Sequence, residues 1–412
     1  MERNNWRSQT CAFLTSLITL IAVGCNSTGA LIRGDSKHTD DLKVRHDPEL
    51  SAKLEQVRSA HGVPGMGLAV LLDYDVAIAV AGKRRADRGE LLQDTDAFHL
   101  GSDTKAVTAS LFARLVDRGV LHWNESLAEA MPDFSGMDPA FRDVTVEMLM
   151  RHVAGLPGSG AFTPEFTKGF DENWPIKEQR KWMAERFLSR APKQPPGKRF
   201  EYSNYGYLII GHIVERATGK TWEELVQQEV FEPLAMRGCG FGPTATSLHP
   251  NGNWAHDVKG DSYVATEEDN PQLIGPAGTV YCNLESWARF AAAHAHPNSG
   301  SWLTPASMGH LHEPFTAIGT PLGKDIGLGW GITQTQPPRL THSGSNGYNF
   351  AEIVVIPLWH AAVLVTCNAG DARGGAAAKE ASDFFVAELL KTVSDVKETP
   401  IELKKPKVAW LR

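Results

Sequence analysis

The stretch Gly101-Ser102-Asp103-Thr104-Lys105, with the apolar run at 107–120 that follows it, is the segment around which the rest of the chain can be placed. The apolar residues of that run recur at helical spacing and close at Gly119, a residue type that commonly terminates helices. Ser102 is therefore predicted at a helix N-terminus, where unpaired N–H groups and the positive end of the helix dipole stabilise a developing oxyanion. Lys105 falls on the same helical face. If that face is buried, desolvation lowers the pKa of Lys105 and makes its amine a base for the serine hydroxyl.

The Ser-x-x-Lys spacing is weak evidence when taken alone. Ser394-Asp-Val-Lys397 has the same spacing and lies in a charged tail. An N-capping Ser102 followed by a surface Lys105 accounts equally well for the isolated pattern. Two further motifs are needed to favour a catalytic interpretation.

The second motif is Tyr202-Ser-Asn204, which follows a Pro-Pro-Gly turn at 195–197 and precedes a helical pattern at 207–217. It is predicted on a loop that enters a cleft. Tyr202, beside two cations, could act as a phenolate that takes the serine proton or activates water. Asn204 could donate to a substrate carbonyl and accept from the lysine, although a packed tyrosine and a capping asparagine remain the alternative. Tyr281-Cys-Asn283 repeats the pattern, but a helix start behind it favours an N-cap role for its asparagine.

The third motif is His342-Ser-Gly344, which the flanking residues place on a strand that ends in a turn. Gly344 would let the backbone of a substrate approach closely. The N–H of Ser345 is then predicted to pair with that of Ser102 as an oxyanion hole. The alternative for His342 is a half-exposed strand histidine.

Strand patterns occur at both ends of the chain and helical patterns between them. Apolar and β-branched runs lie at 66–72 and 76–80, and again at 328–335, 350–356 and 361–367. Helical patterns lie at 207–217, 221–230 and 376–390. We predict an α+β fold in a domain at 48–395, in which 48–97 and 275–392 form an antiparallel sheet flanked by helices. Residues 98–274 form a mostly helical inserted lobe, and the active site lies in the cleft between the two lobes. The segment 157–196, with Trp174, is predicted to lie over the site and, with Trp254 and Trp330, to shape substrate choice, unless these tryptophans belong to the core.

The N-terminal 25 residues have the features of a secretory signal. Arg3 and Arg7 precede an apolar run of about 14 residues, which is shorter than the roughly 20 that span a bilayer. The run ends at Ala22-Val-Gly-Cys25, which resembles an imperfect bacterial lipoprotein box with Cys25 as the lipid-bearing residue. Ordinary cleavage nearby is the alternative. Residues 26–47 are predicted to be a polar tether and 396–412 a tail, and the protein is expected to be exported to the periplasm or cell envelope, with a lipid anchor as its only membrane contact.

Composition excludes several classes of function. The 412 residues carry a formal net charge of −7, so nucleic acid is not an expected partner. Neither a metal nor a cofactor site is predicted, because the His and Cys residues lack ligand spacing. After signal removal, Cys239, Cys282 and Cys367 remain; buried thiols are predicted, with one disulfide as the alternative.

Taken in order, the three motifs resemble those of the serine β-lactamase and penicillin-binding-protein superfamily. In detail they are similar to its class C β-lactamase-related branch, which includes D-alanyl-D-alanine carboxypeptidases, D-aminopeptidases and esterases. The resemblance spans about residues 50–392 and includes similar stretches at 98–102, 149–157, 275–280 and 327–331.

The resemblance implies a role for each motif residue. Ser102 would be the acylated nucleophile, Lys105 its proton partner and Tyr202 the base. Asn204 would bind substrate, and His342 would meet the substrate carboxylate or assist proton transfer. His342 stands where class C β-lactamases have lysine, a change shared with the peptidase and esterase members. The segment beginning at His152 also departs from the family pattern and is predicted to be structural.

The sequence therefore predicts a serine hydrolase that acts through an acyl-enzyme on a small amide or ester. A true β-lactamase is the first alternative. A lipid-anchored penicillin-binding or sensor domain that is acylated without turnover is the second.

Overall fold

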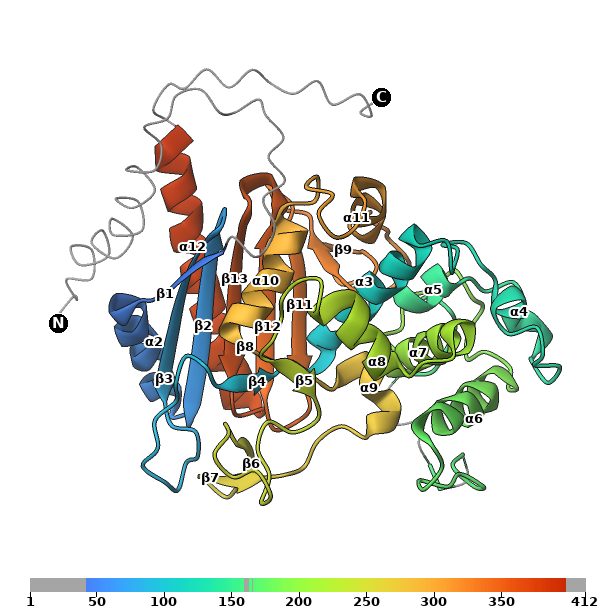
Figure 1. The fold of residues 1–412 in the computed structure, drawn as a ribbon, viewed down its shortest axis with the longest axis horizontal. Helices are drawn as coiled ribbons and strands as arrows, with labels where there is room; N and C mark the ends of the chain where they lie inside the picture. The colour runs from blue at the N-terminus through green and yellow to red at the C-terminus, as the bar shows by residue number, and fades with distance from the viewer. Residues whose placement is uncertain (1–41, 159–162, 165, 398–412) are drawn as a thin grey trace. The chain divides into compact units, whose positions relative to one another are not determined.

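An eight-stranded sheet is assembled from both ends of the chain (Figure 1). The computed structural model describes residues 42–158, 163–164 and 166–397. The strand order is β1-β3-β2-β13-β12-β11-β10-β9, so three N-terminal strands form one side of the sheet, five C-terminal strands form the other, and β2 pairs directly with β13. The strands are β1 (Lys43–His46), β2 (Gly65–Leu72), β3 (Asp75–Gly82), β9 (Lys324–Ile326), β10 (Gly331–Thr333), β11 (Leu340–Ser345), β12 (Phe350–Ile356) and β13 (Ala361–Cys367).

The predicted antiparallel sheet is confirmed except at one edge. All neighbouring strands are antiparallel apart from β1, which pairs with β3 in parallel. The helix α2 (Pro48–His61) lies between β1 and β2 in the sequence and packs on β2 and β3. It is part of the crossover connection that a parallel pair of strands requires. The strand predicted at 328–335 is shorter than expected. Gly329 forms a turn there with φ +79°, and a Cβ at this position would lie 2.8 Å from the Lys105 carbonyl.

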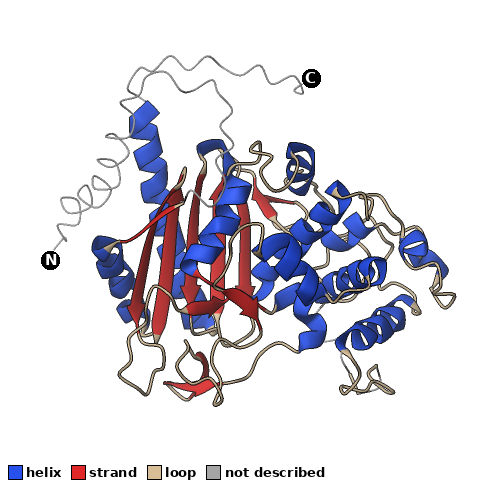
Figure 2. Cartoon of the chain, in the orientation of Figure 1, coloured by secondary structure: helices blue, strands red, loops and turns tan. Residues whose placement is uncertain are grey.

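Helices cover the sheet and form a separate group beside it (Figure 2). The helix α10 (Leu284–Ala295) packs on β2, β12 and β13. The inserted lobe is mostly helical, as predicted, and its helices pack on one another around α3 and α7. Its helices are α3 (Thr104–Asp117), α4 (Leu127–Ala130), α5 (Val146–Met150), α6 (Ile176–Leu188), α7 (Asn204–Thr218) and α8 (Trp222–Val226). The C-terminal part also contains α9 (Gly275–Gly278) and α11 (Pro305–Leu311).

The helix α3 is the centre of this lobe. Eleven of its residues are buried, including polar ones, so it has no solvent face of the kind that a surface helix presents. It begins three residues earlier than predicted, because a 3₁₀ turn, η2 (Gly101–Asp103), leads directly into it. A helix packed on all sides holds the first motif rigidly.

The other helical predictions are confirmed with shifted ends. The helix α7 starts at Asn204 rather than 207 and ends at Gly219, whose φ is +77°. The pattern at 221–230 is α8 followed by a π-helical turn, Gln227–Phe231, with Thr221 and Glu224 forming a capping box. The helix predicted at 376–390 is α12 (Ala372–Lys397). The chain divides into two compact units, 35–382 and 1–34 with 383–412, and of the second the structure describes only residues 383–397 of α12.

Two cysteines form a disulfide, which corrects the prediction of three buried thiols. Cys239 in β5 (Cys239–Phe241) is bonded to Cys282 in β8 (Val280–Asn283), because register pairing of the two strands places these residues opposite each other. Cys367 is a buried free thiol, as predicted. The three-stranded sheet is completed by β4 (Ala97–His99), and a separate hairpin consists of β6 (Ala255–Lys259) and β7 (Ser262–Thr266).

The predicted signal segment, lipid-bearing Cys25 and most of the tether lie outside the described residues. Among the residues that are described, no helix is long and apolar enough to cross a membrane.

Candidate active site

Ser102 and Lys105 lie side by side, as the first motif predicts. Ser102 is in the turn η2, and Lys105 is in the first turn of α3. The Nζ of Lys105 donates to Ser102 Oγ over 3.1 Å and to the backbone carbonyl of Ala277 in α9 over 2.7 Å. The Lys105 side chain is 0% exposed, which excludes the alternative of a surface lysine.

Burial makes Lys105 a usable base. Removal of the ammonium from water lowers the pKa of Lys105 from 10.5 to about 7, and the nearby Asp103 carboxylate opposes part of that shift. About half of the lysine side chains are therefore neutral near pH 7. A neutral amine within hydrogen-bond reach of a serine hydroxyl can accept its proton.

Tyr202 is on the other side of the nucleophile. Its hydroxyl is hydrogen-bonded to Ser102, and its ring centre lies 4.8 Å from Lys105 Nζ. Although 39% of the residue is exposed, its hydroxyl is desolvated, and burial raises the pKa of Tyr202 well above its usual value. Tyr202 is therefore a neutral phenol in the free site, so the predicted phenolate is wrong for this state.

Asn204 makes no hydrogen bond to the lysine among the described residues. It is the first residue of α7, and its Oδ1 is buried without a hydrogen-bond partner among the described residues. The predicted bond to Lys105 is replaced by the Ala277 carbonyl. The rejected motif at 281–283 behaves as expected, since Asn283 Oδ1 accepts from the backbone N–H of Ser286 at the start of α10.

His342 lies on β11 at the open side of the sheet. β10 pairs only with Leu340 and Thr341 of this strand, so in the described part of the chain no strand covers 342–345 on that side. The Nδ1 of His342 lies 3.1 Å from Asp103 Oδ1 and 3.1 Å from the Ser343 carbonyl. Asp103 is 2% exposed and was not singled out from the sequence. It joins the third motif to the first.

Two glycines bring the nucleophile turn against β11. A Cβ on Gly101 would lie 2.4 Å from the backbone nitrogen of Ser345, and one on Gly344 would lie 2.0 Å from the Leu100 carbonyl and 2.7 Å from the nitrogen of Ser102. Gly344 is thus required for close approach of the turn, whereas the sequence suggested close approach of a substrate. The turn that carries Ser102 and the end of β11 that carries Ser345 are therefore in close contact, and the oxyanion hole made by their N–H groups stays a prediction.

A cavity of about 230 Å³ is lined by residues of the second and third motifs. It is lined by Tyr202, His342 and Trp330, and by residues that the sequence did not assign to the site, among them His152, Tyr207 and Lys324. His152 was predicted to be structural, but its ring centre lies 4.4 Å from that of Tyr202, and its Nδ1 accepts from the backbone N–H of Ser203.

The predicted cover at 157–196 does not line this cavity in its described residues. It contains α6, which packs on α7, and Trp174, which contacts Phe170 and Trp182. Trp254 lies elsewhere, under the guanidinium of Arg85. Of the three tryptophans proposed from sequence, only Trp330 is at the cavity.

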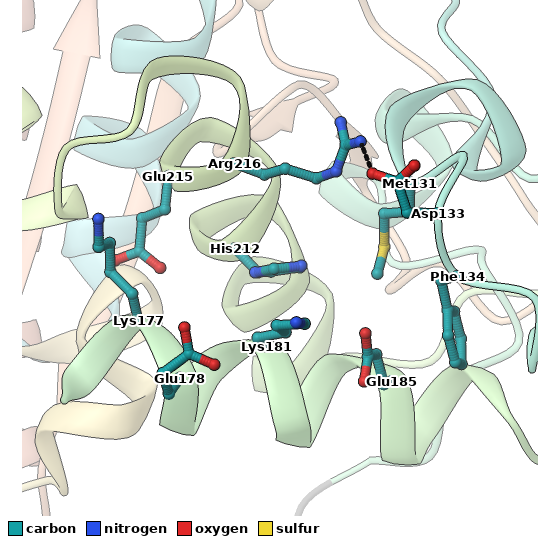
Figure 3. Close-up of a pocket in the computed structure, with 10 residues that line it drawn as sticks. All are labelled: Met131, Asp133, Phe134, Lys177, Glu178, Lys181, Glu185, His212, Glu215 and Arg216. Carbon is teal, nitrogen blue, oxygen red and sulfur yellow. Dashed lines mark hydrogen bonds and ion pairs between the residues drawn. The ribbon is translucent and has the colours of Figure 1, made fainter. Parts of the chain in front are cut away.

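A second cavity of about 340 Å³ lies between α6, α7 and the segment that follows α4 (Figure 3). Its charged side chains alternate in sign along α6, and Arg216 is hydrogen-bonded to Asp133 across it (Figure 3). It contains no serine, cysteine or threonine nucleophile and none of the three motifs. The candidate active site is the cavity lined by Tyr202 and His342, because Tyr202 is hydrogen-bonded to Ser102 and His342 contacts Asp103 of the same turn.

The geometry agrees with comparisons to known proteins. The beta-lactamase family matches residues 50–386, which is most of the chain. The chain belongs to the beta-lactamase family. This family member is 26% identical over 360 residues to penicillin-binding protein 4 of Amycolatopsis lactamdurans, covering 84% of the chain and 90% of that relative. It is also 26% identical over 210 residues to the D-alanyl-D-alanine-carboxypeptidase/endopeptidase AmpH of Escherichia coli K12, a match that covers 48% of the chain and only 52% of AmpH.

Solved structures of low sequence identity share the fold. The octameric penicillin-binding protein homologue from Pyrococcus abyssi superimposes with a TM-score of 0.68 at 23% identity, covering 83% of this chain and 77% of that one. The D-amino acid amidase from Ochrobactrum anthropi SV3 superimposes with a TM-score of 0.67 at 20% identity, covering 85% and 99%. The chain therefore shares its fold with both of these structures.

Proposed function

We propose that the protein is a serine hydrolase that forms an acyl-enzyme on a small amide or ester. The observation that carries the proposal is the buried Lys105 amine, hydrogen-bonded to Ser102 and with a pKa of about 7. A structural lysine in this position would be expected to pair with a carboxylate at hydrogen-bond distance, whereas Nζ contacts a hydroxyl and a carbonyl.

Acylation would begin with the neutral amine of Lys105. As Ser102 Oγ attacks the carbonyl carbon of the substrate, its proton passes to Lys105 Nζ. The negative charge that develops on the carbonyl oxygen would be stabilised by the N–H groups of Ser102 and Ser345, each worth roughly 10²–10³ in rate. The bond to the leaving group then breaks, and the leaving group takes a proton from the protonated lysine, directly or through the Tyr202 hydroxyl.

Deacylation would use the same groups in reverse. A water molecule gives its proton to neutral Lys105, directly or through Tyr202, and its oxygen attacks the acyl carbon. The bond to Ser102 Oγ breaks, and Oγ recovers a proton. Asn204, whose Oδ1 has no partner among the described residues, is the proposed contact for the substrate amide.

The substrate class favoured by the site is an amide or ester rather than a β-lactam. His342 supports this choice because it replaces the lysine typical of class C β-lactamases. The names of AmpH, a carboxypeptidase/endopeptidase, and of the D-amino acid amidase from Ochrobactrum anthropi support an amide substrate. The cavity is also lined by the aromatic side chains of Tyr207 and Trp330 and by Lys324.

Labelling of Ser102 tests the proposal. A fluorophosphonate probe should label the purified protein stoichiometrically, and a Ser102→Ala variant should take up none. Peptide mapping should place the label on Ser102; an intact folded protein that remains unlabelled would refute a serine hydrolase. A screen of D-Ala-D-Ala peptides, p-nitrophenyl esters and nitrocefin then separates the alternatives. Nitrocefin turnover above that of Ser102→Ala would favour a β-lactamase, and a burst without turnover of any substrate would favour a sensor domain.

We also propose that the protein is exported and that Cys25 carries a lipid. The support is the sequence of the first 25 residues. Expression of the full chain with a radiolabelled fatty acid should give a labelled protein in the membrane fraction, and Cys25→Ala should abolish that label. Release of an unlabelled mature protein into the soluble fraction would favour ordinary signal cleavage.

A further inference from the structure

A single buried carboxylate connects the first and third motifs. Asp103 follows the nucleophile directly, and 239 positions separate it from His342, yet its Oδ1 lies 3.1 Å from His342 Nδ1. The same 3₁₀ turn carries Ser102, and Lys105 follows two residues later in the first turn of α3. Asp103 has no other side-chain partner among the described residues, because its Oδ2 is buried without a hydrogen bond. The side-chain contact that the structure describes for Asp103 is therefore with His342, a residue of the candidate active site.

The contacts of His342 determine its tautomer. Nδ1 also lies 3.1 Å from the carbonyl of Ser343, and a carbonyl oxygen can only accept a hydrogen bond. The proton of the neutral imidazole must therefore be on Nδ1, and Nε2 is an acceptor. His342 lines the 230 Å³ cavity, and among the described residues Nε2 makes no hydrogen bond.

We propose that Asp103 is a positioning residue that couples the two motifs: its carboxylate holds His342 with Nε2 toward the substrate cavity, and its negative charge lies beside Lys105. This inference rests on the proposed acyl-transfer function. It adds a residue that acts through two others and touches no reacting atom. The motif spacing Ser-x-x-Lys leaves position 103 unspecified, so the spacing alone does not single out Asp103.

The charge of Asp103 has a defined effect on the base. Burial lowers the pKa of Lys105, and Asp103 raises it by stabilising the ammonium. Loss of that charge leaves only the effect of burial, so the pKa of Lys105 falls further. The remaining titratable groups around the amine are Tyr202, Tyr207 and His152. Burial raises the pKa of both tyrosines and lowers that of His152, so all three stay neutral between pH 6.5 and pH 9.

The test compares Asp103→Asn with the wild type in the pH dependence of ester acylation. Asp103→Asn should lower the acylation rate roughly 10- to 100-fold, the loss expected for one charge-assisted hydrogen bond. The acid limb of the pH profile, which is the range in which the rate rises as Lys105 loses its proton, should move to lower pH. Because Asp103 also contacts His342, the comparison is repeated in a His342→Gln background, where the shift must persist if it belongs to Lys105. Asp143→Asn, an exposed residue with the same change in charge, should leave both the rate and the limb unchanged.

Two outcomes would overturn the inference. One is an Asp103→Asn protein that loses thermal stability while its acid limb stays in place, since that is the behaviour of a residue that only supports the fold. The other is a ¹⁵N NMR spectrum of the wild-type protein in which the neutral His342 carries its proton on Nε2. The NMR experiment needs no variant, so it decides the orientation even if Asp103→Asn does not fold. Failure of the proposed function is distinguishable, because the wild-type protein would then show no acylation of Ser102.

Discussion

Acylation of Ser102 should depend on pH with a midpoint near 7, because Lys105 must be neutral to accept the serine proton. The size of this effect on the fraction of neutral Lys105 follows from burial of the amine. With an ordinary pKa of 10.5, roughly one lysine in 3,000 would be neutral at pH 7, whereas a pKa of about 7 leaves about half of them neutral. The fold thus increases the amount of usable base roughly 1,500-fold at neutral pH.

The assay is the burst of p-nitrophenolate from a p-nitrophenyl ester, measured by stopped flow between pH 5 and pH 9. Below the midpoint the acylation rate should fall about tenfold per pH unit as the ammonium form accumulates. Lys105→Arg should reduce the rate by about 10³ or more and remove the rise through pH 7, because a guanidinium does not lose its proton. Lys259→Arg, at an exposed position of β6, is the matched control and should behave as the wild type.

Two results would contradict this reasoning. A rate that is constant from pH 5 to pH 9 would mean that proton removal by Lys105 does not limit acylation. A midpoint above pH 9 would mean that the amine keeps the pKa of a solvated lysine. In either case Lys105 would not be the base, and Tyr202 would be the next group to test.

Three further predictions concern the surroundings of the nucleophile. Gly344→Ala should displace the nucleophile turn, since its Cβ would meet backbone atoms at 2.0–2.9 Å; we expect about 100-fold slower acylation and roughly 1–3 kcal/mol lower stability in urea unfolding, with Gly309→Ala, where the Cβ meets nothing, as the control. Tyr202→Phe removes the hydroxyl and keeps the ring, so kcat should fall about 10- to 100-fold while KM changes little; an unchanged kcat would exclude the phenol from proton transfer. Reduction of the Cys239–Cys282 disulfide opens a loop closed over 43 positions, which should lower the free energy of unfolding by about 4 kcal/mol, whereas fluorophosphonate labelling at 25 °C should persist.

Local patterns predicted much of the fold. The strands at 350–356 and 361–367 have the predicted bounds, because uninterrupted apolar and β-branched runs between turns leave few alternatives. The strand predicted at 328–335 forms only over Gly331–Thr333, because the chain turns at Gly329 to pass the backbone of α3. The parallel pairing of β1 was also missed, since register at a sheet edge depends on how α2 crosses between strands.

The sequence by itself determined the family, the order of the three motifs and the local setting of each. Ser102 before a helix, Asn204 at a helix start and His342 on a strand follow from residue types and spacing along a few turns of chain. The tertiary structure decided what those side chains can do. Desolvation of Lys105, the neutral Tyr202 and the bond between Asp103 and His342 depend on segments far apart in the chain, and both burial and hydrogen-bond geometry arise only when those segments pack together.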